Sequence, residues 1–170
     1  MAEKTAFRRI LVTSGTGTGR TELSALDAAL VDAGIFGYNI FPLSSVIPFG
    51  FTVEIVEQER KKLLLDHTRL GDKLYVVIAR NVQAQFGDKA CAGLGWVNTV
   101  ENTHTWGLFV EHTGSSESYV SEHIRLSLDG MTQNRLDYKF GEVQALISSI
   151  ACEGPPVAAV VVAVYALERW

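Results

Sequence analysis

Two adjacent serines, Ser44 and Ser45, are the strongest candidates for chemistry in this chain. The β-forming residues at 38–43 predict a short strand before the pair, and Pro48 prevents regular structure from continuing far beyond it. A turn at this point would hold the Ser45 hydroxyl against the carbonyl carbon of Ser44. The hydroxyl could then attack its own preceding peptide bond, as an activated serine attacks a substrate carbonyl. Such an N-to-O acyl shift converts the amide into an ester.

Elimination of that ester would cut the chain into residues 1–44 and 45–170. It would leave dehydroalanine at position 45, and hydrolysis with loss of ammonia would leave a pyruvoyl group on the new terminus. The two serines also fit an ordinary turn, because serine side chains commonly bond to nearby backbone groups. Both interpretations stay open on the dipeptide alone.

A series of short motifs surrounds the two serines. They are GTGTG at 15–19, TELSALDAAL at 21–30, AGI at 33–35, Asn39, and SSVIP at 44–48. In these motifs the chain resembles the pyruvoyl-dependent arginine decarboxylases, which carry an Asn six residues ahead of the serine that becomes pyruvoyl. The resemblance is dense over 13–48 and looser, in order and type of element, beyond. It departs at 24–26, where Ser-Ala-Leu replaces the usual Asn-Ala-Phe.

The resemblance implies an enzyme that decarboxylates L-arginine to agmatine and CO2. Its cofactor would be the covalent pyruvoyl group derived from Ser45, with no metal and no pyridoxal phosphate. Asn39 would polarise or position the Ser44 carbonyl, and Asp27 and Leu30 would bind the substrate. A carboxylate suits that role because its two oxygens accept the planar guanidinium fork. Without the resemblance, the residues favour a solvated Asp27 at the edge of an apolar stripe.

Glu111 lies near the end of a strand predicted at 105–112. Alternation places Leu108 and Val110 on one face of this strand and Phe109 and Glu111 on the other. A carboxyl group on an apolar face is desolvated, which favours its protonated form and suits a proton donor. A strand-end glutamate that reaches solvent is an equally good interpretation. The resemblance assigns Glu111 as the general acid. Alternation turns His112 to the opposite face, where a packed or surface residue is expected.

Hydrophobic periodicity predicts the elements that must position these residues. A helix is predicted at 21–33, with a buried stripe of Leu23, Leu26, Ala29 and Leu30 and with Gly34 as its stop. A second helix is predicted at 116–128, with a stripe of Val120, Ile124, Leu128 and Met131. The Glu, Gln, Lys and Leu content at 54–65 favours a helix over a loop.

The remaining apolar segments predict strands. They lie at 7–14, 38–43, 73–83, 90–98, 105–112, 143–153 and 157–167. The three at 73–83, 90–98 and 105–112 suggest an antiparallel meander. Between the first strand and first helix, the glycines at 15–19 match neither a Walker loop nor a dinucleotide motif, so only exposed backbone N–H groups at a helix start are expected there.

Composition narrows the class of protein. The 170 residues fit one domain, and 47% hydrophobic with 20% charged residues excludes a disordered chain. The net charge of −4 argues against a nucleic-acid partner. Cys91 and Cys152 lack a C-x-x-C spacing and are expected to be buried and reduced, in the cytoplasm. The four histidines show no metal-ligand spacing, and the apolar run at 157–167 is too short to span a membrane.

Two helices and about six strands in one domain predict an α+β fold. The resemblance implies an αββα sandwich, assembled as a homotrimer of cleaved two-chain protomers with the active site between subunits. Two alternatives remain: a pyruvoyl decarboxylase of another amino acid such as histidine, ornithine or lysine, and an uncleaved trimer without catalytic activity. The joint presence of Asn39, Ser44, Ser45, Asp27 and Glu111 argues against the second.

Overall fold

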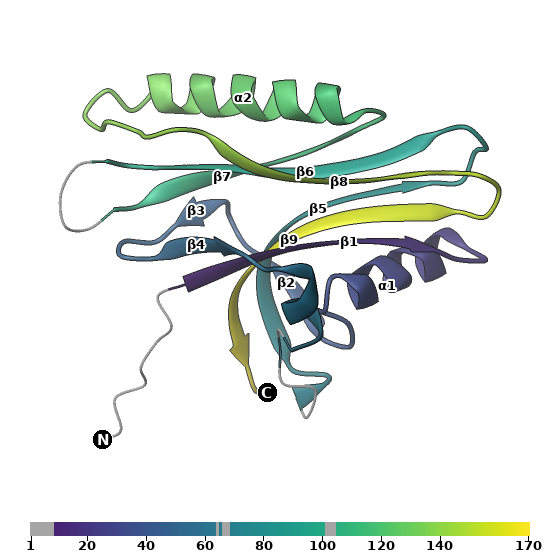
Figure 1. The fold of residues 1–170 in the computed structure, drawn as a ribbon. Helices are drawn as coiled ribbons and strands as arrows, with labels where there is room; N and C mark the ends of the chain where they lie inside the picture. Colours follow the sequence, from purple (N-terminus) through teal and green to yellow (C-terminus); the bar gives the residue numbers. More distant parts are fainter. Residues whose placement is uncertain (1–8, 64, 66–68, 101–104) are drawn as a thin grey trace.

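The computed structural model describes residues 9–63, 65, 69–100 and 105–170, which form four layers (Figure 1). Helix α1 (Glu22–Asp32) covers one sheet, α2 (Glu117–Gln133) covers another, and the two sheets pack face to face between them. The strands are β1 (Arg9–Thr18), β2 (Asn39–Pro42), β3 (Val46–Ile47), β4 (Thr52–Ile55), β5 (Lys73–Gln83), β6 (Lys89–Asn98), β7 (Gly107–Gly114), β8 (Gln144–Ala151) and β9 (Val157–Glu168). The layers are those of the αββα sandwich that the sequence predicted.

The order of the strands explains where the two serines lie. The first sheet has the order β2-β5-β9-β1-β4, and the second has the order β3-β7-β6-β8. Strand β2 pairs parallel to β5 at one edge of the first sheet, and β3 pairs antiparallel to β7 at one edge of the second. The chain therefore crosses from one sheet to the other between β2 and β3, and Ser44 and Ser45 lie in this crossing.

Strand β9 lies between two hydrophobic clusters, one on each face of the first sheet. Its odd-numbered residues from 157 to 163 face the core between the sheets, and its even-numbered residues from 158 to 164 face the cluster under α1. Burial on both faces explains why residues 157–164 are continuously apolar, and the strand predicted at 157–167 is confirmed.

The Gly-rich segment belongs to β1 and is not a loop. The prediction that the first strand ends at Ser14 was wrong, because residues 15–18 continue the antiparallel pairing of β1 with β9. The glycines at these positions serve close packing instead of exposing backbone N–H groups. A Cβ on Gly15 or Gly17 would overlap the backbone of Ala29, so glycine allows α1 to lie directly on the strand.

Replacing Gly17 by alanine should therefore lower the free energy of unfolding by about 1–3 kcal/mol, as overpacking does elsewhere. The added methyl would lie 2.6 Å from the Ala25 carbonyl oxygen and would push the helix away. Gly130→Ala in α2 is the matched control, since its Cβ meets nothing within 4 Å and alanine suits a helix better than glycine. Urea unfolding of both variants measures the difference, and equal stabilities would contradict the close packing.

The segment after β3 differs from its prediction. Residues 54–65 were expected to be helical, but Glu54 lies in β4 and, among the described residues of this range, which leave out 64, a short 3-10 helix, η1 (Gln58–Leu63), is the only helical turn. Parallel pairing of β4 with β1, from Arg9↔Thr52 to Val12↔Ile55, overrides the local helix preference. The Glu54 carboxylate also binds Arg9 at 3.1 Å and Arg60 at 2.8 Å, which ties β4 and η1 to β1.

The predicted meander is wrong at its first strand. Strands β6 and β7 do pair antiparallel, but β5 belongs to the first sheet, where it pairs with β9 along its whole length. The other side of β6 is taken by β8. Alternation within each strand could not reveal which strands are neighbours, because every strand of a sandwich faces a core.

Helix α2 and the two cysteines follow their predictions. Ser116 caps the helix, and Val120, Ile124 and Leu128 are its buried residues. Cys91 packs in the same cluster beneath α2, and Cys152 lies between the sheets. Both thiols are free and buried, and burial raises the pKa of Cys91.

Candidate active site

Backbone hydrogen bonds hold the crossing on both sides. The Leu43 N–H donates to the Val76 carbonyl at 2.8 Å, which extends the pairing of β2 with β5. The Phe109 N–H donates to the Ser45 carbonyl at 2.8 Å, which begins the pairing of β3 with β7. Ser44 is exposed and Ser45 is half-buried. The bond between them therefore lies at an accessible point of a fixed backbone.

Ser45 and Ser44 each have a partner suited to the predicted reaction. The Ser45 Oγ donates to Glu111 Oε1 at 2.7 Å. The Val46 N–H donates to the Ser44 carbonyl oxygen at 2.8 Å, which closes a tight turn centred on Ser45. A carboxylate at this distance can take the hydroxyl proton, and an N–H on the carbonyl oxygen stabilises the charge that develops during attack. The arrangement can activate both the nucleophile and the bond that it would break.

Glu111 comes from the strand face that the sequence predicted, but its surroundings differ. Phe109 packs in the core between the sheets, whereas Leu108 and Val110 pack under α2, so the predicted alternation is confirmed. Glu111 follows Phe109 on the same face, yet its side chain is exposed. A single chain therefore does not desolvate Glu111 as expected on an apolar face. The alternative interpretation, a glutamate that reaches solvent, describes Glu111 in one chain.

Tyr165 is a third side chain at this site, and the sequence analysis did not single it out. It lies on β9 of the first sheet, and its hydroxyl donates to the Val46 carbonyl at 3.0 Å. Its ring lies 6.3 Å from the Phe109 ring, centroid to centroid. Burial and, to a lesser extent, the charge of Glu111 raise the pKa of Tyr165, so its hydroxyl stays protonated. A polar tip on an otherwise apolar strand was the one available signal.

Asn39 lies in β2, but its side chain does not reach Ser44 within this chain. The Asn39 Nδ2 donates to the Gly71 carbonyl at 2.5 Å, and the Trp170 Nε1 donates to the same oxygen at 3.0 Å. In the structure, the bond to the Ser44 carbonyl that was expected of Asn39 is made by the backbone N–H of Val46. The bond to Gly71 instead fixes Asn39 at the start of β2, two residues before Phe41, in the strand that leads to the crossing.

Asp27 and Leu30 lie away from this cluster. Both are on α1, which covers the outer face of the first sheet, whereas Tyr165 packs against the core between the sheets and Glu111 bonds Ser45. Asp27 is exposed, and Leu30 packs partly against the cluster under α1. The predicted leucine stripe is wrong at Leu23, which is 76% exposed, because the small side chains of Ala25 and Ala29 make the close contact. One chain thus does not bring Asp27 to Ser45.

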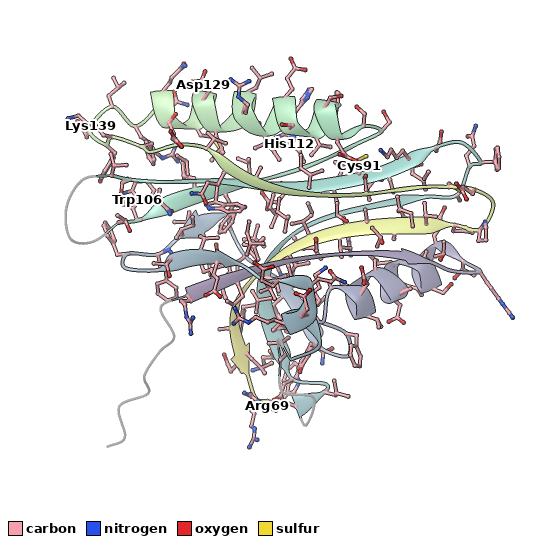
Figure 2. All side chains as sticks on the ribbon, viewed as in Figure 1. Arg69, Cys91, Trp106, His112, Asp129 and Lys139 are labelled. Carbon is pink, nitrogen blue, oxygen red and sulfur yellow. The ribbon has the colours of Figure 1, made fainter. Side chains whose placement is uncertain are left out.

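His112 and Cys91 lie away from Ser44 and Ser45, and Figure 2 shows both between α2 and the sheet beneath it. The His112 Nε2 lies 2.8 Å from Ser127 Oγ, and burial lowers the pKa of His112. This is the packed histidine that the sequence favoured. Within the described residues no group of His, Cys, Asp and Glu is arranged to hold a metal ion. No helix among those residues is long and apolar enough to cross a membrane.

Comparison with known proteins identifies the family. The family described as pyruvoyl-dependent arginine decarboxylase (PvlArgDC) matches residues 9–169. A protein of that name from Methanothermobacter thermautotrophicus is 34% identical over 139 residues, which are 82% of each chain. Another from Picrophilus torridus is 32% identical over 110 residues, 65% of this chain and 57% of that protein, so the match spans little more than half of that relative.

The chain belongs to the pyruvoyl-dependent arginine decarboxylase family, as the motifs around the two serines predicted. Among solved structures, a pyruvoyl-dependent histidine decarboxylase at pH 8 is similar with a TM-score of 0.40 and 12% identity. That similarity covers 55% of this chain and 50% of the other, and it is too slight to support any conclusion about the site.

Proposed function

We propose that this chain cleaves itself between Ser44 and Ser45 and then decarboxylates L-arginine to agmatine. The observation that carries the proposal is the 2.7 Å hydrogen bond from Ser45 Oγ to Glu111, at a serine whose preceding carbonyl already accepts the Val46 N–H. Membership of the family supports the reaction and the substrate.

Self-cleavage would use Ser44, Ser45 and Val46 at the crossing together with Glu111 of β7. Glu111 takes the proton of Ser45 Oγ, which attacks the Ser44 carbonyl carbon, and the Val46 N–H stabilises the negative charge on the Ser44 oxygen. Breakage of the C–N bond, with a proton returned to the nitrogen, gives the ester. Loss of the Ser45 α-proton then expels Ser44 as a carboxylate and leaves dehydroalanine, and water replaces its nitrogen, which departs as ammonia.

The residues around position 45 fit a pyruvoyl group at that position. The Phe109 N–H would hold the carbonyl of residue 45, and Glu111 would lie beside the adjoining ketone. Once formed, the group supplies a ketone that joins to the substrate amine and draws in the electrons released as CO2 leaves. Phe109 N–H would stabilise charge on the carbonyl of residue 45, and Glu111 would return a proton to the substrate α-carbon.

The substrate site is proposed to lie between copies of the chain, in a trimer. Asp27 lies on the far side of the first sheet from Ser45, so another copy would have to bring it to the reacting end. Apolar side chains around the crossing are exposed in one chain, including Val46 at 47% and Phe49 at 66%. A neighbouring subunit that covered them would also exclude water from Glu111 and from a substrate guanidinium bound to Asp27.

Asp27→Asn should leave cleavage intact and raise the KM for arginine about a hundredfold. Loss of one partner of a buried ion pair costs roughly 3–5 kcal/mol, whereas an exposed pair is worth at most about 1 kcal/mol. The size of the effect therefore also reports whether a second copy covers Asp27. Steady-state kinetics measure it, with Glu22→Gln, an exposed carboxylate on the same helix, as the control. A change of only a few fold would contradict an interfacial guanidinium site.

The intact mass of the purified protein under denaturing conditions tests the proposal directly. Two chains are expected, and the longer should begin at residue 45 and be lighter by one ammonia than a serine-terminated chain. Assay of the cleaved protein with arginine, histidine, ornithine and lysine then identifies the substrate. A chain that stays whole on prolonged incubation would favour the uncleaved trimer, and turnover of another amino acid alone would overturn arginine.

A further inference from the structure

Strand β3, which follows the proposed cleavage point, is short and lies at the edge of its sheet. It has only two residues, Val46 and Ile47, paired with Leu108 and Gly107 of β7. It is an edge strand, so one side of its backbone faces away from the sheet. Ile47 is fully buried in the core between the sheets, whereas the Val46 side chain is 47% exposed, so burial holds the strand at Ile47 and contributes little at Val46. The residues before Ile47 are therefore the part of this edge strand that can fray when they become a chain end.

On its outer side, the Val46 backbone makes two hydrogen bonds, and cleavage would affect only one of them. Its N–H donates to the Ser44 carbonyl, and its carbonyl accepts the Tyr165 hydroxyl at 3.0 Å. Cleavage between Ser44 and Ser45 turns Ser44 into the free end of another chain, so the first bond loses its covalent support. Tyr165 is unaffected, because it lies on the long strand β9 of the opposite sheet, with its ring against Phe109.

This inference rests on the self-cleavage proposed above. We propose that Tyr165 is a positioning residue, whose hydroxyl anchors the Val46 carbonyl so that residue 45 stays on the Phe109 N–H and beside Glu111 after cleavage. In the uncleaved chain the same position is secured by the covalent bond to Ser44 and by the pairing of β2 with β5. The hydroxyl is therefore needed for turnover more than for processing. Burial of Tyr165 keeps this hydroxyl protonated and able to donate.

The variant Tyr165→Phe tests this role, because it keeps the ring contact with Phe109 and removes only the donor. It should cleave within about threefold of the wild-type rate. Its kcat for arginine should fall about tenfold, the factor expected from one ordinary hydrogen bond, with KM within about twofold. Tyr75→Phe is the matched control, since the Tyr75 hydroxyl donates to Glu168 on the same sheet. That variant should process and turn over like the wild type.

Hydrogen exchange gives a second, activity-independent measurement. The Val46 and Ile47 amides should exchange about tenfold faster in cleaved Tyr165→Phe than in the cleaved wild type. In an uncleaved Ser45→Ala background, Tyr165→Phe should change their exchange little.

The outcomes separate this inference from the function on which it rests. If the wild-type protein turns over arginine, and Tyr165→Phe has the same kcat and the same exchange of the Val46 and Ile47 amides, the positioning role alone is overturned. Slowed cleavage with normal turnover would also overturn it, because Tyr165 would then act on the precursor. A raised KM with normal kcat would replace it with direct substrate binding. A wild-type chain that never cleaves would overturn the proposed function and this inference with it.

Discussion

A Ser45→Ala variant is expected to remain one chain of 170 residues and to form no agmatine from arginine. Without the Oγ that bonds Glu111, position 45 carries no group that can attack the Ser44 carbonyl. No ester forms, so neither dehydroalanine nor a ketone can arise from it. The intact mass after prolonged incubation and a chromatographic assay for agmatine measure the two losses. This is the largest effect expected of any single substitution, because it removes the source of the cofactor.

Ser44→Ala is the informative companion to this variant. Ser44 contributes its backbone carbonyl to the proposed reaction, and alanine preserves that carbonyl and its bond from the Val46 N–H. The variant is expected to cleave and to release a short chain that ends in alanine. Cleavage of Ser45→Ala with blockage of Ser44→Ala would reverse the assignment of the nucleophile. Cleavage of both would point to a contaminating protease.

The long elements of this fold were predictable because each carries a repeated physical pattern. Helix α2 has its buried residues at Val120, Ile124 and Leu128, one turn apart, after a serine cap. Strand β9 is apolar on both faces because it has a core on both faces. Ser44 and Ser45 were singled out for a different reason: the dipeptide alone also fitted an ordinary turn, and the motifs around it carried the resemblance to a known family.

The elements that the sequence could not reveal depend on partners distant in the chain. Strand β3 has two residues, too few for any periodicity, and it exists because β7 offers an edge. The glycines of β1 are explained by the backbone of α1 lying against them, which no local pattern records. Tyr165 meets Val46 across the two sheets, 119 positions apart in sequence. Such contacts depend on the packing of layers and not on the pattern within one element.

Glu111→Gln is expected to slow self-cleavage by about a hundredfold or more and to stop turnover of any chain that does cleave. Glutamine keeps the length and shape of the side chain, but it cannot take the Ser45 proton, and general base catalysis contributes roughly a hundredfold to ten-thousandfold. Glutamine also cannot return a proton to the substrate α-carbon after CO2 leaves. Processing is measured by the growth of the two chains over time, and turnover by agmatine released per cleaved chain.

Glu117→Gln supplies the matched control for this prediction. Glu117 also accepts a serine hydroxyl, from Ser149 at 2.5 Å, and it also binds Lys89, but it lies at the start of α2. These bonds lower the pKa of Glu117. Glu117→Gln should process and turn over normally. If both variants behave like the wild type, Glu111 has no part in the chemistry, and the Ser45 proton must leave by another route.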